Sequence, residues 1–257
     1  MPAVRRNSIS IVTASLNSAQ HLPALTRSLQ RQSDPDFEWV VADGASTDGS
    51  VEYLRSVPGL RLVVSSQPDF GIYDALNRAI RLSSGDYYIV AGVDDEFCAD
   101  AVARFREAIE RDDADLIVAN AMFGRHCFRI KRAPPWLVAE KALIAHHSLG
   151  TAIKKSLHER FGFYSHRFPI AADSLFLLRA CKGGATRNIA PFTAGALGMG
   201  GVSGSDRIGS ATELFRVQLL LGRALIPQLL LLLLRILKAS SSGVRSLHDA
   251  LLRRSAG

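Results

Sequence analysis

Residues 38–50 read EWVVADGASTDGS, a short apolar run that ends in a carboxylate and a glycine-rich turn. Runs of the same kind recur along the first half of the chain, at residues 8–13, 61–65, 87–91 and 115–119. Between them lie segments with apolar side chains at helical spacing, at residues 21–32, 48–55, 73–82 and 100–111. Short apolar strands that alternate with amphipathic helices predict an α/β fold, with a mainly parallel, Rossmann-like sheet covered by helices on both faces.

Polar residues follow four of the predicted strands, in the loops 14–17, 43–48, 67–74 and 92–96. These loops hold an unusual share of the Asp, Asn and Gly in this half of the chain. Because ligands of open parallel sheets bind beyond the carboxyl ends of the strands, we expect the functional site at this edge. After Asn120 the alternation stops, and the sequence predicts a β-hairpin over 121–132 and short helices over 155–162 and 173–182.

The positive charge is concentrated near the C-terminus. The 257 residues contain 31 Lys and Arg against 24 Asp and Glu, but residues 214–257 hold seven of the basic residues and a single acid, Asp249. That segment carries +6 and residues 1–213 only +1, which argues against a nucleic-acid-binding face on the folded body. Three widely spaced cysteines and an N-terminus without a long apolar run predict a cytoplasmic protein without disulfides.

Asp94, Asp95 and Glu96 follow the apolar run at 87–91. Adjacent carboxylates repel each other, and a hard divalent cation that also binds substrate phosphates would relieve that repulsion. The alternative is the N-terminus of a helix, where acidic side chains oppose the macrodipole. The triplet alone leaves both interpretations open.

In the loop DGASTDGS (43–50), Asp48 and Gly49 are explained by a glycine turn in which Asp48 caps the next helix. It does not explain Asp43, which stands at the end of its strand, where a carboxylate could accept a hydrogen bond from a nucleobase N–H. The first loop, TASLNSAQ (13–20), holds no basic residue and no GxGxxG. It therefore argues against a nucleotidyltransferase and against a dinucleotide-dependent dehydrogenase.

Four ordered stretches together resemble the family 2 glycosyltransferases of the GT-A fold, an inverting family that uses nucleotide-sugar donors. They are IVTASLN (11–17), WVVADGASTDGS (39–50), SQPDFGIYDALNRAI (66–80) and YYIVAGVDDEF (87–97). The resemblance continues through residues 145–180 and GGVS (200–203). It is greatest to the branch that builds bacterial exopolysaccharide and lipid-linked glycans.

The resemblance implies roles for individual residues. Asp173 would be the general base of an inverting transfer, and Asp95 would coordinate Mg²⁺ or Mn²⁺ at the donor diphosphate, with Asp94 at the metal or the ribose. Asp43 would bind the base, and His146 would lie near the donor phosphates. The other expected donor-site residues are Thr13, Ser15, Asn17, Asp69, Gly71 and Asp74. The implied partners are a nucleotide-sugar donor, with UDP favoured, and a glycan acceptor.

Two positions depart from the family pattern. Gly92 stands where an acidic residue often begins the metal motif, and Ala172 stands where an acid often precedes the base. The alternative is therefore a scaffold or regulatory protein of the same fold that binds a nucleotide sugar without catalysis. Without the resemblance, the simplest interpretation of Asp173 is a helix N-cap, and that of His146 is a structural histidine.

The most apolar stretch is LFRVQLLLGRALIPQLLLLLLRILK (214–238). Its longest uncharged run, residues 224–234, is too short for a helix that spans a bilayer. The basic residues around its leucines favour a helix that lies in the headgroup region of an anionic membrane. The alternative is a helix pair packed on the domain or in a dimer interface, which leaves a homodimer open.

We therefore expect a catalytic domain over residues 1–213 and a membrane-associating tail over 214–257. Within the domain, residues 1–120 would form the nucleotide-binding half and residues 121–213 the acceptor half. The protein would be peripheral on the inner face of the plasma membrane, where the tail meets anionic lipid and a polyprenyl-linked acceptor is presented.

Overall fold

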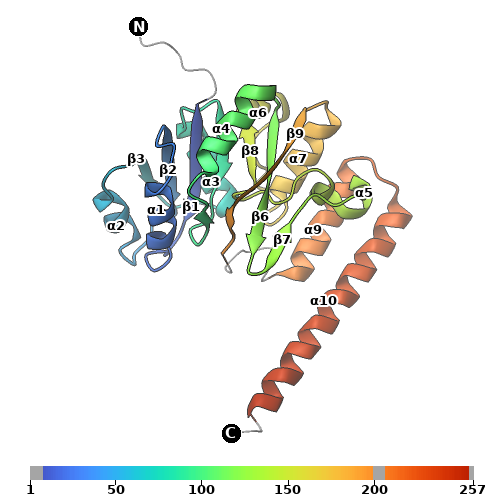
Figure 1. Ribbon diagram of the computed structural model, residues 1–257. Coiled ribbons are helices and arrows are strands. Elements are labelled where there is room, and N and C mark those ends of the chain that lie inside the picture. Colours follow the sequence, from blue (N-terminus) through green and yellow to red (C-terminus); the bar gives the residue numbers. More distant parts are fainter. Residues whose placement is uncertain (1–7, 199–205, 255–257) are drawn as a thin grey trace.

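The computed structural model describes residues 8–198 and 206–254, with side chains described up to residue 239. The GGVS segment (200–203) lies outside the described residues. Figure 1 shows a sheet with helices on both faces and a long C-terminal helix that extends away from this body.

The first half of the chain alternates strands and helices as predicted. Its elements are β1 (Ile9–Ser15), α1 (Leu22–Gln30), β2 (Phe37–Asp43), α2 (Ser50–Ser56), β3 (Arg61–Ser66), α3 (Ile72–Leu82) and β4 (Tyr87–Val90). β1 pairs with β2 and β4, and β2 pairs with β3, all in parallel. Ser15, Asp43 and Ser66 end their strands in register, so the three strand ends lie side by side at one edge of the sheet.

The second half adds antiparallel strands. Its elements are β5 (Glu96–Phe97), α4 (Ala101–Asp112), β6 (Leu116–Phe123), β7 (His126–Phe128), α5 (Pro135–Val138), the 3-10 helix η1 (Ala139–Ala142), β8 (Thr151–Lys154), α6 (Leu157–Phe161), α7 (Ala172–Lys182) and β9 (Arg187–Ala196). β8 lies between β4 and β6 and is antiparallel to both, and β9 is parallel to β6. In the nine-stranded sheet, β6 and β9 therefore run with β1–β4, whereas β5, β7 and β8 run the opposite way.

These elements confirm the α/β fold, the parallel strands of the first half, the hairpin after Asn120 (β6 and β7) and the two short helices (α6 and α7), whereas the sheet as a whole is mixed. β5, β8 and β9 were not predicted. The predicted N-cap of α2 is wrong by one residue, because Gly49 occupies that position with a φ of +89°. Asp48 lies just before it and accepts the backbone N–H of Ala19.

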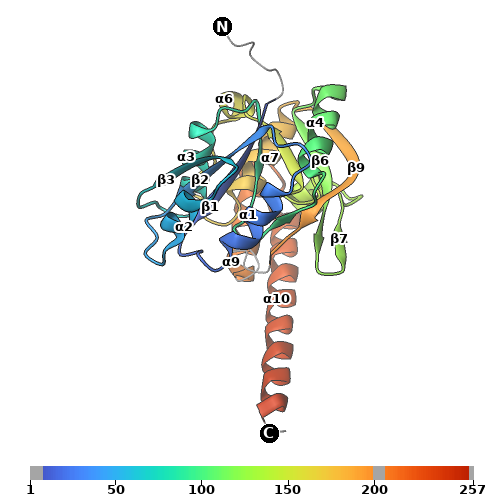
Figure 2. The same cartoon turned by 60° about the vertical axis from the view of Figure 1, so that its left-hand side comes forward.

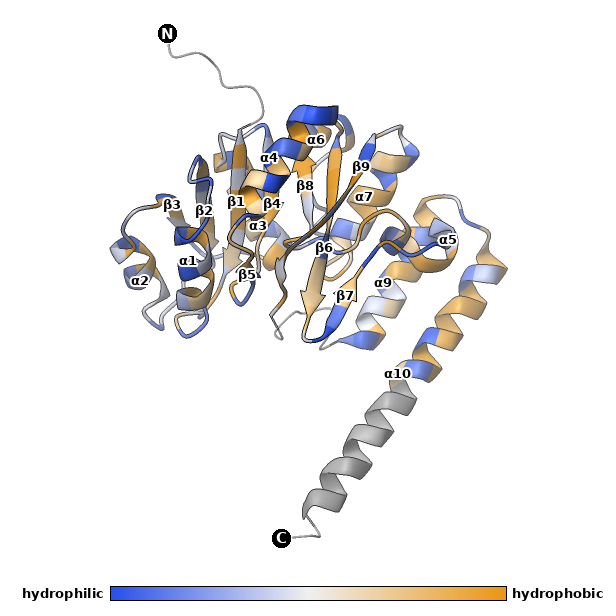
Figure 3. Ribbon diagram, in the orientation of Figure 1, coloured by the Kyte–Doolittle hydropathy of each residue, from blue (hydrophilic) through white to orange (hydrophobic). Residues whose placement is uncertain are grey.

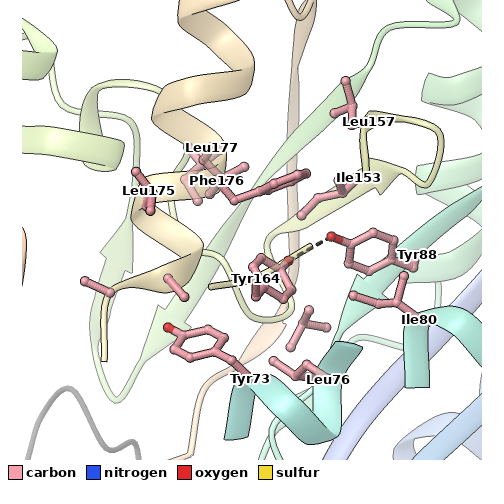
Figure 4. Packing of buried hydrophobic residues seen from close by; sticks show 14 of the residues in the cluster. Tyr73, Leu76, Ile80, Tyr88, Ile153, Leu157, Tyr164, Leu175, Phe176 and Leu177 are labelled. Carbon is pink, nitrogen blue, oxygen red and sulfur yellow. Dashed lines mark hydrogen bonds between the residues drawn. The ribbon is translucent and has the colours of Figure 1, made fainter. Parts of the chain in front are cut away.

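The hydrophobic core lies on both faces of the sheet. Tyr87 and Tyr88 of β4 point to opposite faces, Tyr87 toward α1 and α4 and Tyr88 toward α3 and α7. Figure 4 shows part of the packing on the Tyr88 face. Burial on both faces explains why the strands are continuous apolar runs in the sequence.

The C-terminal helices differ in how they meet the body. α9 (Arg207–Leu220) crosses the boundary expected between residues 213 and 214 and buries Val217 in the core. α10 (Leu225–Arg254) extends away from the sheet, as Figures 1 and 2 show from two sides. Its first turns are joined to α5, where Gln228 donates to the carbonyl oxygen of Trp136 at 2.8 Å.

α10 exposes many apolar side chains. They are Leu225, Ile226, Leu229, Leu230, Leu233, Leu234 and Leu237. Figure 3 shows this apolar segment beyond the edge of the body. Within the described part of the chain, no helix combines the length and apolar character needed to cross a bilayer.

Candidate functional site

Asp43 is fixed at the end of β2 by serine hydroxyls and a turn. Its side chain is fully buried and accepts hydrogen bonds from the Ser46 hydroxyl at 2.5 Å, the Ser46 N–H at 2.8 Å and the Ser66 hydroxyl at 2.8 Å. The register of β2 and β3 brings Ser66 beside it. The carboxylate is thereby held in one orientation at the carboxyl edge of the sheet, as the sequence predicted.

Two buried polar atoms beside Asp43 have no hydrogen-bond partner among the described residues. One is the hydroxyl of Ser15 at the end of β1, and the other is Nε of Arg78 on α3. The Arg78 guanidinium donates to the carbonyl oxygen of Asp43 at 2.6 Å and lies 3.9 Å from a carboxylate oxygen of Asp69. Buried polar groups are normally paired, so these two atoms are suited to contact a ligand.

Asn17 shapes the loop that follows β1. It has a φ of +48°, and its side-chain oxygen accepts the N–H of Thr47 at 3.0 Å. Its own N–H donates to the Ser46 hydroxyl at 2.7 Å. Asn17 therefore joins the loops after β1 and β2. Thr13, by contrast, is buried in the core and accepts the indole N–H of Trp39 at 3.0 Å.

The turn before α3 and the first turn of the helix carry three more of the predicted donor-site residues. Asp69 accepts the N–H of Gly71 at 3.0 Å, and Asp74 accepts the N–H of Phe70 at 3.2 Å. Gly71 has a φ of +113°, a conformation that favours glycine. Asp69 also lies against Gly44, where an added Cβ would come within 2.8 Å of its Oδ2. The Asp69 turn and the Asp43 loop are thus in contact.

Asp95 connects three loops. Its carboxylate accepts the Gly92 N–H at 2.7 Å, the Ser148 hydroxyl at 2.6 Å and the Gly198 N–H at 3.0 Å, and the residue is only 3% exposed. Asp94 packs against Gly198, because an added Cβ there would lie 1.9 Å from the Asp94 Cγ. The segment continues into β5, and α4 begins only at Ala101. The helix-terminus interpretation of this acidic triplet is therefore wrong.

His146 and His147 precede the Ser148 that binds Asp95. His146 Nδ1 lies 3.2 Å from the carbonyl oxygen of Ser148, and its ring packs against Phe128 at a centroid distance of 5.6 Å. His147 faces the other way and places Nδ1 3.7 Å from Oδ2 of Asp173.

Asp173 lies in the first turn of α7, and its side chain is 19% exposed. Its Oδ1 accepts the Tyr73 hydroxyl at 2.8 Å and the N–H of Ser174 at 2.8 Å. The N-cap of α7 is Ala171, so the N-cap interpretation of Asp173 is wrong. Among the described residues, no hydrogen bond to the other oxygen, Oδ2, is found, and the imidazole of His147 lies 3.7 Å from it.

Burial shifts the proton affinities around Asp173. Burial, with the Asp173 charge, raises the pKa of Tyr73 well above its ordinary value, so that the phenol stays a donor. Burial lowers the pKa of His147 although the Asp173 charge opposes this, so the imidazole is neutral at pH 7. Burial and the Asp173 charge together raise the pKa of Glu140, whose carboxylate accepts the Ser174 hydroxyl.

Five of the predicted residues lie in three groups, each defined by contacts with one another or with supporting residues. Asp43, Asp69 and Arg78 form the first, Asp94 and Asp95 the second, and Asp173 with Tyr73 and His147 the third. α3 joins the first group to the third through Arg78 and Tyr73, and residues 146–148 join the second group to the third. The sequence analysis missed the supporting residues Arg78, Tyr73, His147, Ser148 and Gly198. Only the position of Tyr73 in GIYDALN and the pair His146–His147 could have pointed to any of them.

Comparison with known proteins gives consistent results. The family model "Glycosyl transferase family 2" matches residues 10–178. A PGL/p-HBAD biosynthesis glycosyltransferase of Mycobacterium bovis is 32% identical over 177 residues, which cover 66% of this chain and 68% of that protein. An uncharacterised glycosyltransferase of Mycobacterium tuberculosis is 29% identical over 184 residues, 67% of this chain and 68% of that protein.

Two solved structures have a similar fold. Residues 1–349 of Staphylococcus aureus TarS, in complex with UDP-GlcNAc, align with a TM-score of 0.66 and 19% identity over 82% of this chain and 65% of that chain. The match spans only 39% of the longer TarS chain. The mannosyltransferase PcManGT of Pyrobaculum calidifontis, in complex with GDP-Man and Mn²⁺, aligns with a TM-score of 0.64 and 18% identity over 96% of this chain and 81% of that chain.

Proposed function

The chain belongs to glycosyl transferase family 2 and has a GT-A fold, and from this premise we propose that it transfers a sugar, with inversion, from a nucleoside diphosphate donor to a glycan acceptor. The setting of Asp173 carries the proposal. One of its oxygens is held by Tyr73 and Ser174, and the other lies 3.7 Å from His147, the neighbour of the Ser148 that binds Asp95.

The donor site that we propose is built around Asp43, Ser15 and Arg78. Asp43 is held where it can accept an N–H from the base, and the unpartnered Ser15 hydroxyl and Arg78 Nε can bond to the nucleotide. Asp69 and the N-terminus of α3 would lie next to the donor. TarS binds UDP-GlcNAc and PcManGT binds GDP-Man, so the fold accommodates either base. UDP is the donor nucleotide that we favour.

A divalent cation fits the chemistry of Asp94 and Asp95. The described residues contain no group of three or more His, Cys, Asp and Glu that could hold a metal, so the diphosphate and water would supply the other ligands. Oδ2 of Asp95 accepts two hydrogen bonds and Oδ1 accepts one, so of its about four lone-pair sites the one left for a cation is on Oδ1. Asp94 Oδ1 and Asp95 Oδ2 both lie 3.2 Å from the place of an added Gly92 Cβ, so the two carboxylates are close neighbours.

The proposed reaction needs one base. Oδ2 of Asp173 accepts the proton of the acceptor hydroxyl, whose oxygen forms a bond to the anomeric carbon. The bond from that carbon to the diphosphate oxygen breaks, and its electron pair leaves with the nucleoside diphosphate. A cation bound at Asp94 and Asp95 would offset the charge on the departing diphosphate. Attack from the face opposite the leaving group inverts the configuration.

We propose that α10 brings this site to an acceptor at an anionic membrane. α10 exposes a row of leucines, and the basic residues of its sequence favour anionic headgroups by about 1 kcal/mol each. Trp136, 40% exposed, lies where α10 joins the body and is a residue type common at membrane interfaces. The acceptor would then be a glycan on a polyprenyl lipid, and the protein would be peripheral on the inner face of the plasma membrane.

One observation favours a second candidate, a nucleotide-sugar-binding protein without catalysis. The Asp95 carboxylate is engaged by three protein donors, and Gly92 provides no acid beside it. If these bonds leave no room for a cation, the diphosphate could bind but would leave slowly. Donor binding that does not depend on Mn²⁺, together with the absence of turnover, would favour this candidate.

Calorimetric titration of UDP-, GDP-, dTDP- and CMP-sugars, each with and without Mn²⁺, tests the donor site. We expect one nucleotide to bind, and its affinity to fall about tenfold or more when Mn²⁺ is removed or in Asp95→Asn. Asp100→Asn is the matched control, because Asp100 is an exposed acid paired with Arg104. If no donor binds to the folded protein, the proposed donor site is wrong.

Vesicle flotation tests the membrane proposal. We expect the protein to float with vesicles rich in phosphatidylglycerol and not with neutral phosphatidylcholine vesicles. The double variant Leu230→Glu, Leu234→Glu places two charges on one face of α10 and should abolish flotation. Leu82→Glu, at another exposed leucine, is the matched control and should float normally. Equal flotation of the wild type and the α10 variant would contradict the proposal.

A further inference from the structure

A chain of buried side chains leads from the core to Asp173. His158 Nε2 lies 2.8 Å from the Tyr88 hydroxyl, which lies 2.8 Å from the Tyr164 hydroxyl. The Tyr164 hydroxyl lies 2.8 Å from Nε2 of His147, whose Nδ1 faces Asp173 at 3.7 Å. Figure 4 shows the Tyr88–Tyr164 link among the packed side chains. The donor-site contacts described above do not use this chain.

The inner end of the chain fixes the direction of every hydrogen bond in it. Nδ1 of His158 lies 3.1 Å from the carbonyl oxygen of Gly162, and a carbonyl only accepts, so this nitrogen carries a proton. Burial lowers the pKa of His158 to about 4, so at neutral pH its Nε2 is unprotonated and accepts from the Tyr88 hydroxyl. Tyr88 has then given its only proton, and it must accept from Tyr164.

The same reasoning determines the tautomer of His147. Tyr164 donates to Tyr88, so its oxygen accepts a hydrogen bond from Nε2 of His147. Because burial keeps His147 neutral, Nδ1 carries a lone pair and points it at Asp173. The separation of 3.7 Å is longer than a hydrogen bond, as expected for two atoms with no proton between them.

We propose that His147 is the positioning residue that receives the proton of Asp173 after sugar transfer, an inference that rests on the function proposed above. When Asp173 has taken the acceptor proton on Oδ2, the proton passes to Nδ1 of His147. Asp173 returns to the carboxylate, and His147 becomes an imidazolium that donates to both Asp173 and Tyr164. The 11% exposed imidazole then releases the proton to water before the next turnover.

Several other groups face this pair. Tyr73 donates to Asp173 from α3, and Tyr164 contacts His147 from the loop before α7. The Glu140 carboxylate of η1 lies close enough to sense the Asp173 charge, and the positive charge of His146, when present, disfavours protonation of His147. Glu213 of α9 accepts the N–H groups of Ile170 and Ala171 beside the Tyr73 hydroxyl, and Arg235 of α10 lies close enough to sense the charge of Glu140. The substitution His147→Gln, whose pH profile is the first test below, leaves all of these groups unchanged.

The acid limb of the pH–rate profile tests the proposal. In the wild type, a proton on either Asp173 or His147 inactivates the enzyme. The apparent pKa of the acid limb of kcat/KM therefore belongs to the two residues together. In His147→Gln only Asp173 can take that proton, and we expect the midpoint of kcat/KM to move to lower pH by about one unit. His166→Gln, the same change at an exposed histidine, should leave the midpoint unchanged. Parallel profiles for wild type and His147→Gln would overturn the proposal, because a merely structural role lowers the rate equally at every pH.

The tautomer provides a test that needs no turnover. Nitrogen NMR of the histidine-labelled protein, with His147→Gln to assign the signal, should show Nε2 protonated and Nδ1 unprotonated at pH 7. In Tyr164→Phe the Nε2 partner is lost, and we expect the proton to move to Nδ1, facing Asp173. A protonated Nδ1 in the wild type would refute the proposal even if sugar transfer is confirmed. The expected tautomer in a protein that transfers no sugar would instead refute the proposed function.

Discussion

Gly198→Ala tests the packing of the acidic loop against the end of β9. A Cβ at this position would lie 1.9 Å from Cγ, 2.1 Å from Oδ2 and 2.5 Å from Cβ of Asp94. The closest tolerable approach is 3.0 Å, so Asp94 or the Gly198 backbone must move by at least 1.1 Å. Rotation of the carboxylate alone does not relieve the contact with its Cβ.

The expected result is a loss of donor affinity together with a loss of stability. A displacement of about 1 Å in a group that positions a substrate costs about a hundredfold in rate, and we expect a loss of donor affinity of similar size, whereas overpacking costs about 1–3 kcal/mol of the free energy of unfolding. Calorimetric titration of the donor nucleotide with Mn²⁺ measures the first, and urea unfolding measures the second. Gly183→Ala is the control, because its Cβ would collide with the Phe161 ring at 2.4 Å outside the site. It should lose stability and keep its donor affinity. Wild-type donor affinity in Gly198→Ala would refute the reasoning.

Two further changes test single hydrogen-bonded groups. Burial alone would raise the pKa of Glu38, but hydrogen bonds from Ser10 and Ser84 lower it below the ordinary value of 4.5. The ionised carboxylate therefore stabilises the folded protein. This contribution to the free energy of unfolding is full above pH 4.5 and is lost as the pH falls through the pKa of the folded state. Glu38→Gln should cost about 2 kcal/mol in urea unfolding at pH 7 and less at acid pH, and a cost independent of pH would argue against this assignment. Tyr73→Phe removes the donor to Asp173 and should lower kcat about tenfold with the donor KM unchanged; an unchanged kcat would show that the hydroxyl does not orient the base.

The strands and helices that the sequence predicted are those with strong patterns. β1, β2, β4 and β6 are continuous apolar runs because helices cover both faces of the sheet. β9 was missed because Pro191 and Gly195 interrupt its pattern, and its pairing with β6 shifts register twice. β8 has four residues and β5 only two, too short for any periodicity to be visible.

The position of the site could be predicted, whereas its internal contacts could not. The location of Asp43 and Asp95 could be predicted because both follow parallel strands, and a parallel sheet brings the carboxyl ends of its strands to one edge. Arg78 gives no such signal, since a charged residue on an amphipathic helix is normally in solvent. It bonds to the carbonyl of Asp43 only because α3 packs across the end of β2.

The contacts of the two adjacent histidines could not be predicted from the sequence either. His146 and His147 point in opposite directions, one toward Phe128 and the other toward Asp173. Which of them reaches the base depends on how residues 146–148 turn before β8, a turn in which Leu149 has a φ of +60°. A sequence pattern carries no information on that choice.

The rate of sugar transfer by Asp173→Asn tests the central claim most directly. The assay follows release of nucleoside diphosphate from the donor identified by calorimetry, in the presence of membrane lipid extract as the source of acceptor. Because a general base contributes about 10²–10⁴-fold, we predict that kcat falls at least a hundredfold while the donor Kd stays within about twofold. Turnover within tenfold of the wild type, with the donor still bound, would show that Asp173 is not the base.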